Sequence, residues 1–189
     1  MLLQATKPSF APRRRGLRRD EYDVMVSHGL FEGQRVELLD GDLIEMAPQN
    51  AAHAYAIQVL TRLLVRGVGD RADTRVQLPL AISDNTEPEP DLALVAATPP
   101  SDAHPRTAWL VIEVAESSLY YDRGQKLRSY ARAGIPEYWV VSTERRCVYR
   151  YRRPVGEEYV DESIIPEDGS ISPDAFPDVT VQISALLAR

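Results

Sequence analysis

The sequence predicts an α/β protein in which a mixed central β-sheet is flanked by helices. Two short apolar segments on either side of Asp40-Gly41-Asp42 indicate a β-hairpin, because Asp-Gly between apolar runs favours a tight turn. A helix-like segment lies between the apolar runs at 109–114 and 137–141, and this order suits a parallel crossover. The strand candidates before the crossover suit antiparallel pairing, so the sheet should be mixed.

The N-terminal half is expected to contain two helices and the hairpin. A short helix is predicted at 18–28, where apolar side chains recur on one face. The hairpin strands are predicted at 36–39 and 43–46. Asn50 is a suitable N-cap for a long helix over 51–66, which carries apolar residues at helical spacing.

The C-terminal half alternates strands with one more helix. That helix is predicted over 122–133, because Gly134 and Pro136 follow in the order that ends helices. Prolines make the connection at 97–106 a loop. The strand candidates cover residues 74–80, 91–96, 109–114, 137–141, 147–151 and 179–183.

Composition excludes several classes of protein. The chain has 189 residues, of which 44% are hydrophobic and 26% charged, which is typical of a globular domain. A single cysteine, Cys147, excludes an intramolecular disulfide and a cysteine-rich zinc site. No apolar run approaches the roughly 18 residues of a membrane span. The first residues also lack an apolar signal segment. We therefore expect a cytoplasmic protein with no membrane partner.

Charge is distributed unevenly along the chain. The net charge of −6 opposes a protein that coats nucleic acid by charge alone. Arginines cluster near the N-terminus and again at 145–153, where they could contact phosphates or form a solvated surface. We expect a flexible basic arm at 1–17 and a single domain at 18–189. Within that domain, 154–189 would form an acidic extension packed on the rest.

Two carboxylates occur where strands should bury apolar side chains. Asp91 begins the run Asp-Leu-Ala-Leu-Val, and Glu113 interrupts the run Trp-Leu-Val-Ile-Glu-Val-Ala. A lone ionised carboxylate inside a sheet is costly, so such groups are normally paired or bound to a cation. Oxygen ligands of this kind suit Mg²⁺ or Mn²⁺. The alternative is that both acids lie at strand ends and face water.

Lysine is rare in this chain and its position is informative. Only Lys7 and Lys126 are present, against 20 arginines among the 22 cations. On the predicted helix, Asp122, Lys126 and Tyr130 are spaced four residues apart and share one face. A crossover helix packs on the sheet, so Lys126 could reach the two acids. Alternatively, it pairs with Asp122 on a wet surface.

These residues belong to a longer ordered pattern. Its segments are Glu37-Leu-Leu-Asp-Gly-Asp42, His53, Pro90-Asp91, Val111-Ile-Glu113-Val, Asp122-Arg-Gly-Gln-Lys126 and Tyr130-Ala-Arg-Ala-Gly-Ile-Pro-Glu-Tyr-Trp-Val-Val141. This pattern resembles the PD-(D/E)XK nuclease superfamily and, more closely, the Uma-two family of restriction-endonuclease-like domains. Together they span most of residues 20–151.

The resemblance implies an αβββαβ core, with an added N-terminal helix and hairpin, in a nuclease-like domain. It implies an endonuclease that hydrolyses phosphodiester bonds in DNA with Mg²⁺ or Mn²⁺. Asp91 and Glu113 would hold the metal, with the Val114 carbonyl as an additional ligand. Lys126 would orient the attacking water or stabilise charge on the phosphate.

The resemblance also assigns two further residues and shows one departure. Glu37 would be a third acid near the site, and His53 would contact phosphate or water. The lysine of the parent superfamily follows the glutamate by two positions, where this chain has Ala115. The related family is thought to supply the lysine from the next helix, which Lys126 matches.

Two other functions stay open at this point. The domain could be a catalytically inactive nuclease fold that binds nucleic acid or protein, which the acidic balance and Ala115 would suit. It could also be a structural α/β domain whose acids point outward. A homodimer would suit an enzyme that cuts two strands with two symmetric sites.

Overall fold

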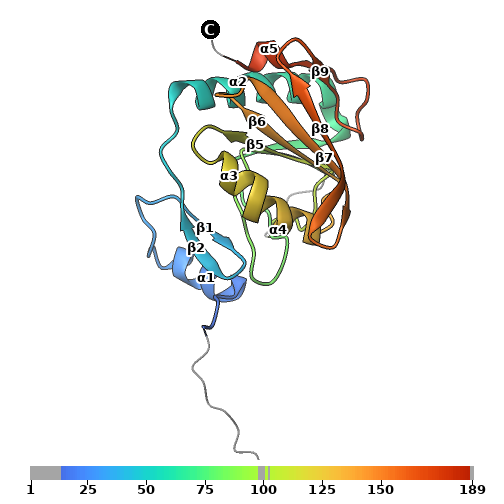
Figure 1. Cartoon of the computed structure of the whole chain (residues 1–189). Helices are drawn as coiled ribbons and strands as arrows, with labels where there is room; N and C mark the ends of the chain where they lie inside the picture. The colour runs from blue at the N-terminus through green and yellow to red at the C-terminus, as the bar shows by residue number, and fades with distance from the viewer. Residues whose placement is uncertain (1–13, 98–100, 102, 188–189) are drawn as a thin grey trace, which may run out of the picture.

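The computed structural model describes residues 14–97, 101 and 103–187 of the chain. Within these residues the centre is a six-stranded sheet with the order β3-β4-β5-β6-β7-β8 (Figure 1). The strands are β3 (Asp73–Val76), β4 (Leu92–Val95), β5 (Leu110–Ala115), β6 (Glu137–Ser142), β7 (Cys147–Val155) and β8 (Glu158–Pro166). β5 and β6 are parallel, and the other neighbours are antiparallel. The predicted mixed sheet and its parallel crossover are therefore confirmed.

Helices cover both faces of this sheet (Figure 1). On one face lie α2 (Ala51–Val68) and the short α5 (Ile183–Leu186). On the other face, α3 (Leu119–Tyr121), the π-helical turn η2 (Asp122–Lys126) and α4 (Leu127–Arg132) follow one another without a break. The remaining elements are α1 (Arg19–Ser27), η1 (Gly69–Arg71), the hairpin of β1 (Val36–Leu39) and β2 (Asp42–Glu45), and the pair β9 (Ser170–Ile171) and β10 (Val181–Gln182).

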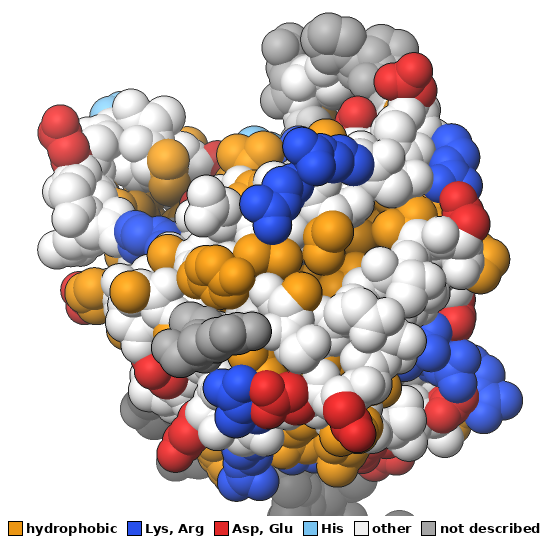
Figure 2. Space-filling view, turned by 90° about the horizontal axis from the view of Figure 1, so that it is seen from above, with side chains coloured by type: hydrophobic (Ala, Val, Ile, Leu, Met, Phe, Trp, Pro, Cys, Tyr) orange, Lys and Arg blue, Asp and Glu red, His pale blue; other side chains and the backbone are white. Residues whose placement is uncertain are grey.

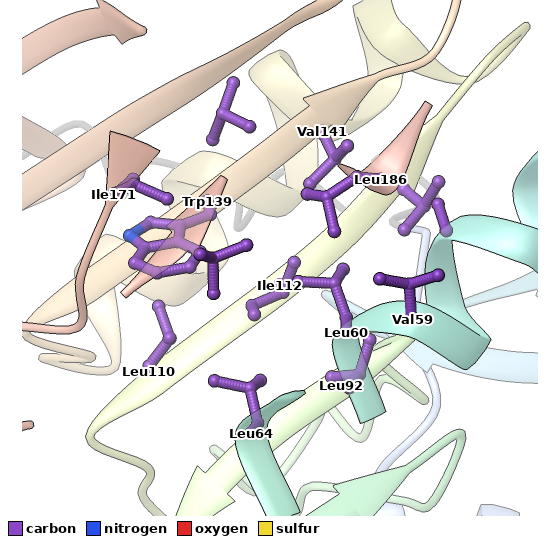
Figure 3. Packing of buried hydrophobic residues seen from close by; sticks show 14 of the residues in the cluster. Val59, Leu60, Leu64, Leu92, Leu110, Ile112, Trp139, Val141, Ile171 and Leu186 are labelled. Atoms are coloured by element: carbon purple, nitrogen blue, oxygen red, sulfur yellow. The ribbon is translucent and has the colours of Figure 1, made fainter. Parts of the chain in front are cut away.

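The face under α2 contains the larger apolar core. Leu60 and Leu64 of α2 pack with Leu92 of β4 and Ile112 of β5, and Trp139 of β6 extends the same layer (Figure 3). Alternate residues of a strand point to opposite faces, which is why every second residue of β5 belongs to this core.

The opposite face carries a second apolar core under the α3–α4 segment. Val111 and Ala115 of β5 point to this side, together with Tyr138 of β6 and Tyr130 of α4. By the same alternation, Glu113 lies between Val111 and Ala115 on this face. The fold therefore directs one buried carboxylate toward the helical segment that carries Lys126.

The predicted hairpin and its turn are confirmed. β1 and β2 pair in register from Val36↔Glu45 to Leu39↔Asp42. Asp40 and Gly41 form the connection with φ values of 52° and 84°. Positive φ at both central residues is the geometry of a type I′ turn, which Asp-Gly favours.

Two predicted elements that border the buried acids differ in detail. The strand expected at 74–80 ends at Val76, because Gln77 has a φ of 51°, which takes the chain out of the extended conformation. The helix expected at 122–133 begins earlier, at Leu119, and contains the π-helical turn η2. Both departures fall on residues that surround the acidic side chains described below.

The C-terminal region contains a strand that the sequence analysis did not predict. β8 pairs with β7 and forms one edge of the main sheet. Its side chains alternate between exposed and half-buried, a pattern obscured by its many polar residues. The strand predicted at 179–183 is shorter, with β10 ending at Gln182 and α5 beginning at Ile183. The basic arm predicted at 1–17 falls largely on 1–13, which lie outside the described residues.

The outer side of α2 mixes apolar and basic side chains. Tyr55 and Val65 are exposed there, near Arg62 and Arg66. Figure 2 looks onto this side of the molecule and shows apolar side chains gathered across its middle with basic ones beside them. Across the residues that the structure describes, no helix has the length and apolar character needed to cross a membrane.

Candidate active site

The register of the sheet places Asp91 beside Glu113. Leu92 of β4 pairs with Ile112 of β5, so the preceding Asp91 lies opposite Glu113 at the end of the ladder. The Asp91 N–H donates to Glu113 Oε2 at 3.3 Å, and the Val114 N–H donates to Asp91 Oδ2 at 2.8 Å. The two acids predicted from the sequence therefore lie side by side at one end of these two strands.

Asp91 is held ionised by its hydrogen-bond partners. His53 Nε2 lies 3.1 Å from Asp91 Oδ1, and the Gln77 side-chain amide donates to the same oxygen at 3.2 Å. Burial opposes ionisation, but the contacts with His53, the Val114 N–H and Gln77 outweigh it and lower the pKa of Asp91 below its ordinary value. Asp91 is therefore a stable anion that faces a histidine.

His53 reaches Asp91 from the first turn of α2. The Asn50 side chain caps that helix by accepting from the His53 N–H at 2.9 Å. The cap fixes the start of the helix, and with it the position from which the imidazole projects. The N-cap prediction is thus confirmed, and it has a direct consequence for the site.

Lys126 lies between two buried glutamates. Its ammonium donates to Glu113 Oε1 at 2.9 Å and is 3.2 Å from Glu37 Oε1. The Lys126 side chain is only 2% exposed. Burial favours the neutral amine, but Glu113, Glu37 and Asp122 outweigh it and raise the pKa of Lys126 well above its ordinary value. Lys126 is therefore a fixed positive charge.

Glu37 enters the site from β1 and is fully buried. Its Oε2 accepts a hydrogen bond from the Glu89 N–H at 3.1 Å. Its Oε1 faces Lys126 without forming a hydrogen bond of good geometry. Glu113 has one more partner, because the Tyr130 hydroxyl donates to its Oε1 at 2.8 Å. The hairpin thus adds a third acid to the pair on the main sheet.

Asp122 completes a group that we call the acid cluster: Glu37, Asp91, Glu113, Asp122 and Lys126. The Asp122 carboxylate is buried and accepts a hydrogen bond from the Ser118 hydroxyl at 2.5 Å. Burial raises the pKa of Asp122 to about 6 and that of Glu113 to about 8, although Lys126 lowers both. One lysine and a neighbouring histidine do not balance these carboxylates, so the cluster favours an additional proton or cation.

A cavity of about 260 Å³ opens onto the acid cluster. Asp91, Glu113, Asp122 and Lys126 all line it, as does His53. Its other walls come from β2, the chain leading into α2 and the turn between β5 and α3. The cluster is therefore accessible to a small ligand or to one end of a larger one.

The oxygen atoms of this site suit a hard divalent cation. Asp91, Glu113 and Val114 line the same cavity, and carboxylate and carbonyl oxygens are preferred by Mg²⁺ and Mn²⁺. In the described part of the chain, no three His, Cys, Asp or Glu side chains are grouped as a ready-made metal cluster. Mg²⁺ usually needs only one or two carboxylates besides water and phosphate oxygens, so the donor set still fits.

The structure brings together every side chain that the sequence analysis placed in the site: Glu37, His53, Asp91, Glu113 and Lys126. Asp122 also joins the cluster, and Tyr130, which the sequence analysis placed on the same helix face, is both a core residue and a partner of Glu113. Gln77 was missed, because nothing in its sequence context marks it apart from its place in a predicted strand. Tyr121, which lines the cavity, was missed for the same reason.

Comparison with known proteins gives a family and a related fold. The sequence model of the Uma2 family, described as "Putative restriction endonuclease", matches residues 19–185. No curated protein matches. A solved structure from Anabaena variabilis ATCC 29413, titled as a putative nuclease belonging to DUF820, is similar with a TM-score of 0.66. The alignment has 14% sequence identity and covers 80% of this chain and 88% of that one, so it shows a shared fold.

Proposed function

The chain belongs to the Uma2 family of restriction-endonuclease-like proteins, and from this premise we propose that it hydrolyses phosphodiester bonds in DNA with bound Mg²⁺ or Mn²⁺. One observation carries the proposal: Asp91 and Glu113 lie opposite each other in the sheet, with Lys126 Nζ 2.9 Å from Glu113, at the wall of an accessible cavity. Buried acids around a lysine at a cavity are typical of a reaction site rather than of a core.

Asp91, Glu113 and the Val114 carbonyl would hold the metal ion. When bound, the ion lowers the pKa of a water molecule and offsets negative charge on the phosphate. Asp91 is suited to this role because its pKa lies below the ordinary value, so no proton has to leave before a cation binds. The raised pKa of Glu113 means that cation binding there would displace a proton at neutral pH.

Lys126 would act as a positive charge and hydrogen-bond donor. Because its three acidic neighbours keep it protonated, it is poorly suited to take a proton from water. It is well suited to stabilise negative charge that develops on the phosphate, since a fixed donor in a buried site needs little reorganisation. Glu37 would position Lys126, and His53 would orient Asp91 while facing the same cavity.

The alternative is a catalytically inactive member of the family that binds nucleic acid or protein. One observation favours it: every carboxylate oxygen of Asp91 and Glu113 already accepts or faces a donor within the protein. If those contacts are too stable, no metal would displace them. A homodimer stays a prediction for either function.

The test is cleavage of labelled oligonucleotides with Mg²⁺ or Mn²⁺, using duplex DNA, single-stranded DNA and RNA as separate substrates and EDTA as a control. Asp91→Asn should reduce DNA cleavage by at least about 100-fold, since loss of mere outer-sphere support of a metal already costs about 10- to 100-fold. Asp178→Asn is the matched control, because Asp178 is exposed, pairs with Arg71 and lies outside the cavity wall.

Calorimetric titration of the protein with Mn²⁺ distinguishes the nuclease from the inactive binding module. Saturable binding to wild type and to Asp178→Asn, lost in Asp91→Asn, supports the enzyme. Nucleic-acid or protein binding without saturable metal binding supports the inactive module. Equal cleavage by wild type and Asp91→Asn at matched purity would overturn the assignment of the active site. Cleavage of RNA but not of DNA would overturn DNA as the substrate.

A further inference from the structure

Tyr121 has a buried hydroxyl that forms no hydrogen bond, although it lines the cavity. Four other tyrosine hydroxyls of the described residues have an acceptor: Tyr22 donates to the Val36 carbonyl, Tyr130 to Glu113, Tyr138 to the Asp122 carbonyl and Tyr159 to the Ile135 carbonyl. The hydroxyls of Tyr149 and Tyr151 each accept from an arginine. A buried hydroxyl without a partner is costly and uncommon. Because the Tyr121 residue lines the cavity, a ligand bound there is a candidate partner for this hydroxyl.

The charges around Tyr121 make its hydroxyl a donor. Burial, and next the negative charge of Glu37, raise the pKa of Tyr121 above its ordinary value. The phenol therefore keeps its proton at any working pH. Asp122 and Glu113 act in the same direction, while Lys126 opposes them. The hydroxyl thus belongs to the electrostatic environment of the acid cluster, and a neutral donor there suits an anionic oxygen.

A second donor is available beside it. An ammonium group has three N–H donors, and in the described part of the chain Lys126 contacts only the carboxylates of Glu113 and Glu37. One N–H of Lys126 therefore remains for a ligand. Lys126 and Tyr121 both line the cavity onto which Asp91 and Glu113 open.

We propose that the Tyr121 hydroxyl donates a hydrogen bond to a non-bridging oxygen of the substrate phosphate, beside Lys126. This makes Tyr121 a further catalytic residue and the cavity a phosphate-binding site. The inference rests on the proposed nuclease function for its substrate class, whereas the binding of phosphate can be measured without any cleavage.

The first experiment measures cleavage kinetics and thermal unfolding of Tyr121→Phe. We expect kcat/KM for DNA to fall by about 10- to 100-fold, the effect of losing one donor to a developing anion. The melting temperature should not fall, because the substitution removes a hydroxyl that has no partner in the protein.

Two tyrosines provide matched controls. Tyr120→Phe changes the neighbouring residue, which is 94% exposed, and should alter neither property. Tyr159→Phe removes a hydroxyl that donates to the Ile135 carbonyl at 2.9 Å, so it should lower the melting temperature and leave kcat/KM unchanged. A loss of activity in Tyr121→Phe that comes with a similar fall in melting temperature would indicate a structural role and overturn the proposal.

The second experiment measures the melting temperature as a function of the concentration of inorganic phosphate, in the presence of Mg²⁺. Wild type and Tyr120→Phe should be stabilised in a saturable manner, and Tyr121→Phe should need at least about fivefold more phosphate, as expected for one lost hydrogen bond. Equal responses, or no response in wild type, would overturn the Tyr121 assignment.

The two experiments separate the inference from the function on which it rests. If wild type cleaves DNA and Tyr121→Phe cleaves it equally well, the inference fails and the nuclease function stands. If wild type cleaves no nucleic acid but binds phosphate through Tyr121, the nuclease function fails and the phosphate site stands.

Discussion

Two buried glutamates on neighbouring strands, Glu137 and Glu113, differ in their hydrogen-bond partners and in the positive charge available to neutralise them. Glu137 on β6 accepts hydrogen bonds from Trp139 Nε1 at 2.8 Å, Arg150 Nε at 2.7 Å and the Asp174 N–H at 2.7 Å. Its counterion is the Arg150 guanidinium, which also pairs with the exposed Asp174. Glu113 on β5 shares one ammonium with other carboxylates at the wall of a cavity.

The difference shows that burial of a charge does not by itself mark a functional site. Glu137 ties β6 to β7 and to the segment after β9, and its hydrogen bonds are completed within the protein. Glu113 belongs to a cluster with more negative than positive charge, which a cation from solution could balance. An incompletely neutralised carboxylate beside a cavity is therefore the better predictor of chemistry.

The largest expected effect is on catalysis. Glu113→Gln should reduce metal-dependent DNA cleavage by at least about 100-fold, because it removes a proposed metal ligand and the main partner of Lys126. Glu137→Gln should leave kcat within about twofold, as its side chain lies outside the cavity wall. Initial rates on one duplex substrate measure both. A comparable loss of cleavage in both variants would contradict separate catalytic and structural roles for the two glutamates.

Glu137→Gln should instead weaken the fold. The amide presents only one oxygen to partners that now share two, so a charge-assisted contact with Arg150 or with the Asp174 N–H is lost. The expected decrease in the free energy of unfolding is about 1–3 kcal/mol. Urea denaturation monitored by tryptophan fluorescence measures it, and an unchanged midpoint would contradict the structural role.

The next prediction concerns pH. In the folded chain the pKa of Glu113 is about 8, above the ordinary 4.5, so the folded state binds more protons than the unfolded state between these values. The free energy of unfolding should therefore fall as pH rises from about 4.5 to 8. Glu113→Gln removes this contribution, and its stability should depend less steeply on pH in that window.

Urea denaturation at several pH values between 5 and 8 measures the two slopes. Asp122, with a pKa of about 6, acts in the same direction, so some dependence should remain in the variant. Mg²⁺ should reduce the loss of stability at high pH in wild type if it binds the ionised cluster. Identical slopes in wild type and Glu113→Gln would show that Glu113 is already ionised at pH 5.

The sequence predicted the fold wherever one local signal sufficed. Asp40-Gly41 specified a turn, and Asn50 specified the start of α2. Asp91 and Glu113 stood out because apolar strands rarely contain lone acids. Lys126 stood out because lysine is rare in this chain and because the pattern around it resembles a known family.

Features that depend on tertiary contacts could not be predicted in this way. β8 mixes polar and apolar residues on both of its sides and is stabilised by pairing with β7, so it lacks a clear alternation of apolar and polar residues. Gln77 reaches Asp91 only because its backbone leaves the extended conformation. The π-helical turn at 122–126 is a packing outcome, and such turns recur at functional sites without a sequence signal of their own.

The smallest effect is expected for charges at the surface of the same sheet. Glu162 on β8 pairs with Arg123 at 2.8 Å, and both side chains are partly exposed. Arg123 is also held over the Tyr149 ring and by the Tyr151 hydroxyl, so it should keep its place in Glu162→Gln. The free energy of unfolding should change by less than about 0.5 kcal/mol, and DNA cleavage should not change. Arg123 belongs to the same helical turn as Lys126. A larger effect on cleavage would therefore mean that Arg123 transmits strain to the acid cluster, so that this turn couples charges at the surface to those in the interior.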